Sequence, residues 1–127
     1  MLDAMPTAPI PASALDIGCG IRQQRFREGL LRLGYTPAGI DLDDIAADSL
    51  ADVHLLPLAD SSIDLMVTNA VFEHLKQPHL AMSEVSRALS DGGMFVGSIA
   101  FCELFHISYF RHLPLAAYHL LESADLT

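Results

Sequence analysis

The chain is poor in basic residues, because seven Lys and Arg stand against 16 Asp and Glu and leave a formal net charge of -9. Proteins that bind DNA or RNA by releasing counterions present a basic surface. Four of the arginines are spread through one expected helix, where they most simply form its solvated face: Arg22, Arg25, Arg27 and Arg32. We therefore expect no nucleic-acid partner.

Cysteine is scarce as well, and long apolar runs are missing. Cys19 and Cys102 are too few and too far apart to suggest a metal cluster or a disulfide framework. No apolar run is long enough to span a bilayer. Residues 1–13 contain no basic residue and are interrupted by prolines, so they do not fit a signal peptide. These absences predict a cytoplasmic protein with no metal site and no membrane partner.

The 127 residues suffice for one domain with a single core. Prolines make residues 1–12 a flexible leader, so we expect the folded domain to occupy residues 13–127. Strands and helices alternate within it, which predicts a parallel sheet with right-handed crossovers. The expected strands are 14–18, 36–41, 53–56, 63–69 and 94–101. The expected helices are 22–33, 43–50, one that starts near Pro78 and stops at Gly92-Gly93, and 113–123.

The run Asp16-Ile17-Gly18-Cys19-Gly20 ends the first expected strand, and Gly39-Ile40-Asp41 ends the second. Glycines at the end of a strand let a ligand approach the backbone, and an acid closing the next strand can bind both ribose hydroxyls. A pyrophosphate does not fit, because Asp16 would repel it and Gln23 replaces the third glycine of the dinucleotide motif. S-adenosylmethionine has adenosine, a cationic methionine end and no phosphate, so the pattern points to methyl transfer.

Five segments in order resemble landmarks of class I S-adenosylmethionine-dependent methyltransferases of the small-molecule group, namely residues 15–20, 39–41, 56–64, 69–75 and 84–93. The resemblance implies an α/β fold with a Rossmann-like parallel sheet of order 3-2-1-4-5 flanked by helices. The family normally adds two final strands that this chain lacks, which implies a minimal member or a truncated product. Residues 101–126 are loosely similar to a subgroup linked to sugar and polysaccharide pathways.

The glycine-containing turn is expected to run beside the methionine part of the cofactor, through Gly18, Cys19 and Gly20. A side chain at either glycine would occupy the volume of the ligand. The alternative is a tight strand-to-helix turn without a ligand. Many relatives have a further glycine where this chain has Arg22, so the affinity is expected to be lower or the loop to have a different shape.

The resemblance also implies how the nucleoside is held. Asp41 would accept hydrogen bonds from the ribose diol, because its two oxygens match adjacent hydroxyls, with Asp43 and Asp44 as alternatives. Asp52 would face the adenine amino group. The other expected contacts are the apolar Leu42 and Val53, which would touch the adenine faces, and Asn69, which would lie beside the reacting methyl group.

No catalytic residue is assigned, and three residues are weak candidates on the acceptor side. His74 follows the fourth expected strand, where a histidine could act as a base near neutral pH, but a structural role is the stronger interpretation. His106 and Tyr109 follow the fifth strand and would arch over the acceptor, or pack within a lid. Asp64 starts the fourth strand at the end away from the site, so we expect it to be a structural hydrogen-bond acceptor.

The sequence therefore predicts methyl transfer from S-adenosylmethionine to a small-molecule acceptor. The alternatives are a catalytically weak or inactive cofactor-binding module and a nicotinamide oxidoreductase, the latter disfavoured by Asp16 and Gln23. Without further strands, the fifth strand would expose an unpaired edge. We expect a homodimer through that edge, or a cover made by the leader or the final helix.

Overall fold

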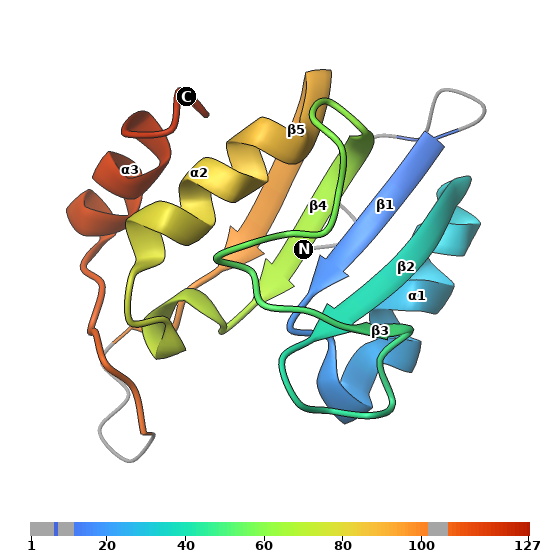
Figure 1. Ribbon diagram of the computed structural model, residues 1–127, viewed down its shortest axis with the longest axis horizontal. Coiled ribbons are helices and arrows are strands. Elements are labelled where there is room, and N and C mark those ends of the chain that lie inside the picture. Colours follow the sequence, from blue (N-terminus) through green and yellow to red (C-terminus); the bar gives the residue numbers. More distant parts are fainter. Residues whose placement is uncertain (1–6, 8–11, 102–106) are drawn as a thin grey trace.

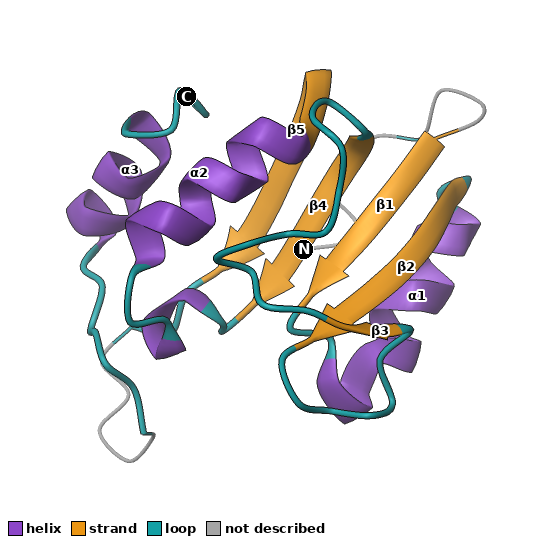
Figure 2. Cartoon of the chain, viewed as in Figure 1, coloured by secondary structure: helices purple, strands orange, loops and turns teal. Residues whose placement is uncertain are grey.

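The computed structural model describes residues 7, 12–101 and 107–127, apart from the side chains of residues 22–25. It contains a five-stranded parallel sheet of order β3-β2-β1-β4-β5, flanked by helices (Figures 1 and 2). The predicted fold class and strand order are confirmed. The strands are β1 (Ala12–Ile17), β2 (Tyr35–Asp41), β3 (Ser49–Leu50), β4 (Ile63–Asn69) and β5 (Leu89–Ser98). The α-helices are α1 (Gln23–Arg32), α2 (Pro78–Ala88) and α3 (Pro114–Glu122), and short 3-10 helices form η2 (Gly20–Arg22) and η3 (Phe72–His74).

Helices cover both faces of the sheet. On one face, Leu30 of α1 packs with Ala14, Leu65 and Val67. On the other face, α2 and α3 lie in front of the sheet (Figure 1), and Met82 packs in a cluster that includes Met66. Successive side chains of a strand point to opposite faces, which is why β4 carries apolar residues at consecutive positions. None of the described helices is long and apolar enough to cross a membrane.

The central strands bring their carboxyl ends to one edge of the sheet. β1 lies between β2 and β4, and Ile17 pairs with Ile40 on one side and with Thr68 on the other. Because the strands are parallel, the loops that follow β1, β2 and β4 meet at this edge, where open α/β sheets bind ligands.

The segment between β2 and β4 differs from the prediction. Residues 43–48 form turns and bends instead of a helix, and the third strand is Ser49–Leu50 instead of 53–56. The Asp41 carboxylate accepts hydrogen bonds from the backbone N–H groups of Asp43 (3.3 Å) and Asp44 (3.2 Å), and Asp48 accepts one from Gly39 (2.7 Å). Such local side-chain bonds compete with helix formation.

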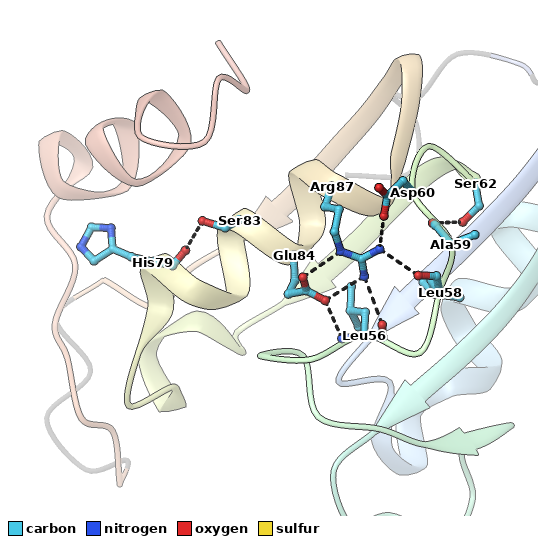
Figure 3. Close-up of polar contacts among 9 residues, drawn as sticks. All are labelled: Leu56, Leu58, Ala59, Asp60, Ser62, His79, Ser83, Glu84 and Arg87. Carbon is cyan, nitrogen blue, oxygen red and sulfur yellow. Dashed lines mark hydrogen bonds and ion pairs between the residues drawn. The ribbon is translucent and has the colours of Figure 1, made fainter.

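Two charged residues of α2 hold residues 56–60 in a loop (Figure 3). Arg87 donates hydrogen bonds to the carbonyl groups of Leu56 (3.1 Å) and Leu58 (2.9 Å) and to the Asp60 carboxylate (2.6 Å). Glu84 pairs with Arg87 (2.8 Å) and accepts the Leu56 N–H (2.8 Å). These contacts lower the pKa of Glu84 and raise that of Arg87. The backbone of Leu56 is thus bound by side chains and does not join the sheet; we call this set the Arg87 network.

The fifth strand also begins earlier than predicted. α2 ends at Ala88 and β5 starts at the next residue, so Gly92 and Gly93 lie within the strand and do not end the helix. The register between β4 and β5 shifts between Ile63 and Leu65. Gly92 has φ +75° there, and a Cβ on Gly93 would lie 2.8 Å from a backbone oxygen of Ser90. The two glycines therefore permit the irregular backbone where the register of the strand shifts.

Asp64 has the structural role predicted for it. Its Oδ2 accepts hydrogen bonds from the backbone N–H of Ser13 (2.7 Å) and from the Ser13 hydroxyl (3.0 Å), and its Oδ1 accepts one from Ser90 (3.0 Å). These donors lower the pKa of Asp64. The carboxylate ties the starts of β1, β4 and β5 together, at the edge opposite the carboxyl ends of the strands.

Candidate functional site

A cavity of about 860 Å³ opens where the carboxyl ends of β1, β2 and β4 meet, and we call it the main cavity. It brings together seven of the residues predicted from the sequence: Gly18, Asp41, Leu42, Asp52, Val53, His74 and Tyr109. Segments that lie far apart in the sequence therefore converge on one space.

The turn after β1 forms the floor of the main cavity and has the shape that glycine permits. Gly18 has φ +67°, a value that other residues adopt at a cost. Its N–H and that of Cys19 both donate to the carbonyl of Ile40, at 2.9 and 3.1 Å. The turn is thus fixed to the end of β2.

Asp41 links that turn to the loop after β2. One carboxylate oxygen, Oδ2, accepts the Gly20 N–H at 3.0 Å, and the other accepts the N–H groups of Asp43 and Asp44. A carboxylate has about four acceptor positions, so Asp41 can hold the loops and still accept a hydroxyl of a ligand. Its position in the main cavity agrees with the predicted ribose contact.

The wall beyond Asp41 combines apolar residues with two acids, Asp43 and Asp52. Val53 is buried and Leu42 is 68% exposed, so an adenine between them would bury apolar surface. Asp52 Oδ1 accepts hydrogen bonds from the backbone N–H of His54 (2.9 Å) and pairs with its ring Nδ1 (2.6 Å). These bonds lower the pKa of Asp52. The predicted adenine contact would use the other oxygen, Oδ2.

Asp16 lies beneath the glycine turn and does not line the main cavity. It is only 4% exposed, and its Oδ2 has no hydrogen-bond partner among the described residues. Burial raises the pKa of Asp16 to about 7, with Arg27 acting against the shift and Asp41 adding to it. A buried carboxylate oxygen without a hydrogen-bond partner is costly, and no donor in the described part of the chain compensates Oδ2 of Asp16.

Three other predicted residues are not on the cavity wall. Gly20 donates to Asp41, and Cys19 is buried, which raises the pKa of its thiol to about 11. Asn69 is exposed at the end of β4, where its Oδ1 accepts a hydrogen bond from Ser98 at 2.6 Å. The next residue, Ala70, does line the cavity and has φ +55°, a strained conformation of the kind found at functional sites.

Residues 107–110 are held over the cavity by the segment after β4. The carbonyl of Glu73 accepts the N–H groups of Tyr109 (2.9 Å) and Phe110 (3.1 Å), and His74 Nδ1 bonds the carbonyl of Ile107 (2.7 Å). The Glu73 side chain is 1% exposed and its Oε1 accepts the Ala100 N–H at 3.1 Å. His74 thus holds Ile107 in place, and Tyr109 reaches the cavity wall. His106 falls outside the described residues.

Comparisons with known proteins show the family. Residues 15–97 match the family described as methyltransferase domain. The chain belongs to this methyltransferase family. It is also 34% identical over 114 residues to an uncharacterized 37.1 kDa protein in transposon Tn4556 of Streptomyces fradiae, a match that covers 76% of this chain but only 32% of that protein. This chain therefore spans about a third of that relative.

Solved structures agree on the fold of the methyltransferase domain. An S-adenosylmethionine-dependent methyltransferase of Mesorhizobium loti is 26% identical, with a TM-score of 0.65 over 79% of this chain and 52% of its own. A Bacillus halodurans C-125 protein solved as a candidate methyltransferase has a TM-score of 0.76 at 13% identity, over 97% of this chain and 66% of its own.

Sequence reasoning missed several residues that the methyltransferase domain places on the cavity wall, chiefly His54, Lys76 and Gln77. Their place in the sequence could have identified them, because each lies shortly after a predicted site residue, in a loop at the carboxyl edge of the sheet. The buried carboxylate of Glu73 was missed too, since its contact with Ala100 spans 27 residues. Among the described residues, no three His, Cys, Asp or Glu side chains are grouped to hold a metal.

Proposed function

We propose that the domain binds S-adenosylmethionine in the main cavity and transfers its methyl group to a small-molecule acceptor. The observation that carries the proposal is the convergence of Gly18, Asp41 and Val53 on one cavity in a chain of this family. The similar Mesorhizobium protein is described as dependent on S-adenosylmethionine, which supports the choice of cofactor.

The residues present fit this cofactor. The cavity offers a carboxylate for a ribose diol at Asp41 and an apolar wall for adenine at Val53. Asp16 Oδ2 is buried without a hydrogen-bond partner in the described part of the chain. A cationic methionine end would compensate that carboxylate, whereas a pyrophosphate would be repelled by it.

The protein would act mainly by binding and orientation. When bound, the cofactor supplies a methyl group on a positively charged sulfur, so the protein need not create an electrophile. Asp41 and Asp52 fix the nucleoside, and residues 107–110 shield the opening from water. His74 Nδ1 donates a hydrogen bond to the Ile107 carbonyl, and the residue lines the main cavity. His74 therefore stays a candidate base for an acceptor that must lose a proton.

Replacement of Asp41 tests the proposal. Asp41→Ala should weaken binding of S-adenosylhomocysteine by about 1.5 to 3 kcal/mol, because the ribose hydroxyls lose a charged acceptor. Asp43→Ala is the matched control, since it removes a neighbouring carboxylate that also lines the cavity. Isothermal titration calorimetry should show a loss for Asp41→Ala alone. Equal affinities for both variants and the parent chain would remove Asp41 from the site.

The inactive-module alternative makes a different prediction. An inactive module would bind S-adenosylhomocysteine. It would not convert S-adenosylmethionine into S-adenosylhomocysteine with any acceptor. A screen of small acceptors that measures S-adenosylhomocysteine release separates the two, and turnover on one acceptor supports the enzyme.

A further inference from the structure

A second cavity, of about 680 Å³, lies next to the main cavity and collects basic side chains. Its wall includes Lys76, His79, Arg111, His112 and His119, and no residue that lines it is acidic. We call it the basic cavity. The chain has a net charge of -9, so this cavity, whose wall has basic and no acidic residues, differs in charge from the molecule as a whole.

The structure shows no carboxylate paired with either cation of the basic cavity in the parts of the chain that it describes. No ion pair joins Lys76 or Arg111 to an acid within the described residues; Lys76 instead lies 5.6 Å from the centre of the Tyr109 ring. His112 Nε2 is buried and lacks a hydrogen-bond partner there. Only His119 has an acid beside it, Glu122 at 2.8 Å. Within the described residues, the Lys76 and Arg111 charges thus face no carboxylate.

The basic groups come from separate parts of the chain, with His119 on α3. Lys76 and His79 flank the start of α2, whereas Arg111 and His112 follow the segment that Glu73 holds over the main cavity. Figure 3 shows the His79 ring projecting from the first turn of α2, away from the Arg87 network. The positive end of the α2 dipole adds to the same field. An anion between the segments would be contacted from both.

The basic cavity and the main cavity share Lys76 and Gln77 on their walls. One molecule could therefore occupy both. We infer that the methyl acceptor carries a phosphate group, which the basic cavity binds while the rest of the acceptor reaches the main cavity beside Tyr109. This inference rests on the proposed methyl transfer, because it assigns the main cavity to cofactor and acceptor.

Phosphate suits this cavity better than the other anions of biology. A phosphate ester offers several charged oxygens at once, which a guanidinium and an ammonium on different segments can share. A nucleic acid or an anionic membrane would meet the acidic remainder of the surface. The acceptor is therefore a small phosphorylated molecule.

Pyrophosphate is the probe for this site, titrated at constant ionic strength into the isotope-labelled chain and followed by the amide signals. The signals of His79, Leu80 and Arg111 should shift and saturate. In the double variant Arg111→Gln/His79→Gln, binding should weaken by about tenfold or more. Arg32→Gln, which removes one exposed charge from α1, should leave it unchanged.

The inference would be overturned by the absence of saturable shifts, by equal weakening in Arg32→Gln, or by malonate binding as tight as that of pyrophosphate. Shifts at Gly18 to Gly20 instead of His79 and Arg111 would also contradict it. Calorimetry with S-adenosylhomocysteine on the parent chain keeps the two proposals apart, because its failure would reject the cofactor site and leave the anion result to stand alone.

Discussion

A Cβ atom on Gly18 would lie 2.4 Å from Cγ2 of Val71, although the two residues belong to loops after different strands. No real contact is that short, so the glycine turn and the loop after β4 meet only because position 18 has no side chain. Both residues also line the main cavity. This contact sets the shape of the cavity floor.

Gly18→Ala should therefore destabilise the fold and reduce cofactor binding. Gly92→Ala is the matched control, because Gly92 also has positive φ (+75°) but no atom within 4 Å of an added Cβ. The control should cost about 1 to 2 kcal/mol through backbone strain alone. Gly18→Ala should cost about 1 to 3 kcal/mol more, from the clash with Val71. Urea unfolding measures both values.

Adding Val71→Ala to Gly18→Ala tests the cause. The second substitution should restore part of the free energy of unfolding, since it removes the Cγ2 atom that the new methyl group meets. Strictly additive effects of the two substitutions would show that the contact does not limit position 18.

The Arg87 network should matter for the cavity as well as for stability. Arg87→Met removes the side-chain donor to the Leu58 carbonyl, one of the donors to the Leu56 carbonyl, and the cation that pairs with Glu84. The urea midpoint should fall, and S-adenosylhomocysteine should bind more weakly because the loop that carries Asp52 and Val53 loosens. Arg87→Lys should not rescue either property, since an ammonium cannot reproduce the fork of a guanidinium. Arg32→Met, at an exposed 3.7 Å pair, should change neither.

Asp16 should make stability depend on pH. Its pKa is raised to about 7 in the fold by burial, so the folded chain holds this proton more tightly than the unfolded chain does. The resulting stability is complete below the unfolded pKa near 4 and is lost as the pH rises through about 7. Asp16→Asn should therefore raise the melting temperature at about pH 8 and leave it nearly unchanged at about pH 4. A constant difference across that range would contradict the assignment.

The free edge of β5 predicts self-association. In the described part of the sheet β5 pairs with β4 alone, and Met94 is 39% exposed on it. α3 packs against α2 and shares a cavity of about 460 Å³ with β5, so it covers a face of that strand. We expect a homodimer joined at this edge, which light scattering would detect, and Met94→Lys should weaken it. A strict monomer with freely exchanging amides at residues 95–99 would exclude it.

The parts of the fold that local patterns determine were predictable. β4 occupies 63–69 as expected, because a continuous apolar run bounded by turns specifies a buried parallel strand. The glycines and the acids closing β1 and β2 likewise located the ligand-binding edge. In each case the signal lies within a few residues of the feature.

The segment between β2 and β4 was not predictable in the same way. Its part around Leu56 is held by Glu84 and Arg87, which lie 28 and 31 residues further along the chain. The expected helix at 43–50 gives way to bonds made by the Asp41 and Asp48 carboxylates. The expected strand at 53–56 does not form, and the long-range bonds of Arg87 and Glu84 hold Leu56 outside the sheet. The basic cavity could not be predicted for the same reason. Lys76 and Arg111 line one cavity because the Glu73 carbonyl accepts hydrogen bonds from the N–H groups of residues 109 and 110.

The central claim is that the main cavity binds S-adenosylmethionine and not a dinucleotide. Isothermal titration calorimetry of the unaltered chain with S-adenosylhomocysteine, and in parallel with NADH, tests it most directly. The account predicts saturable one-to-one binding of S-adenosylhomocysteine and no measurable binding of NADH, because Asp16 lies beneath the glycine turn where a pyrophosphate would have to sit. Binding of NADH with no binding of S-adenosylhomocysteine would contradict the account.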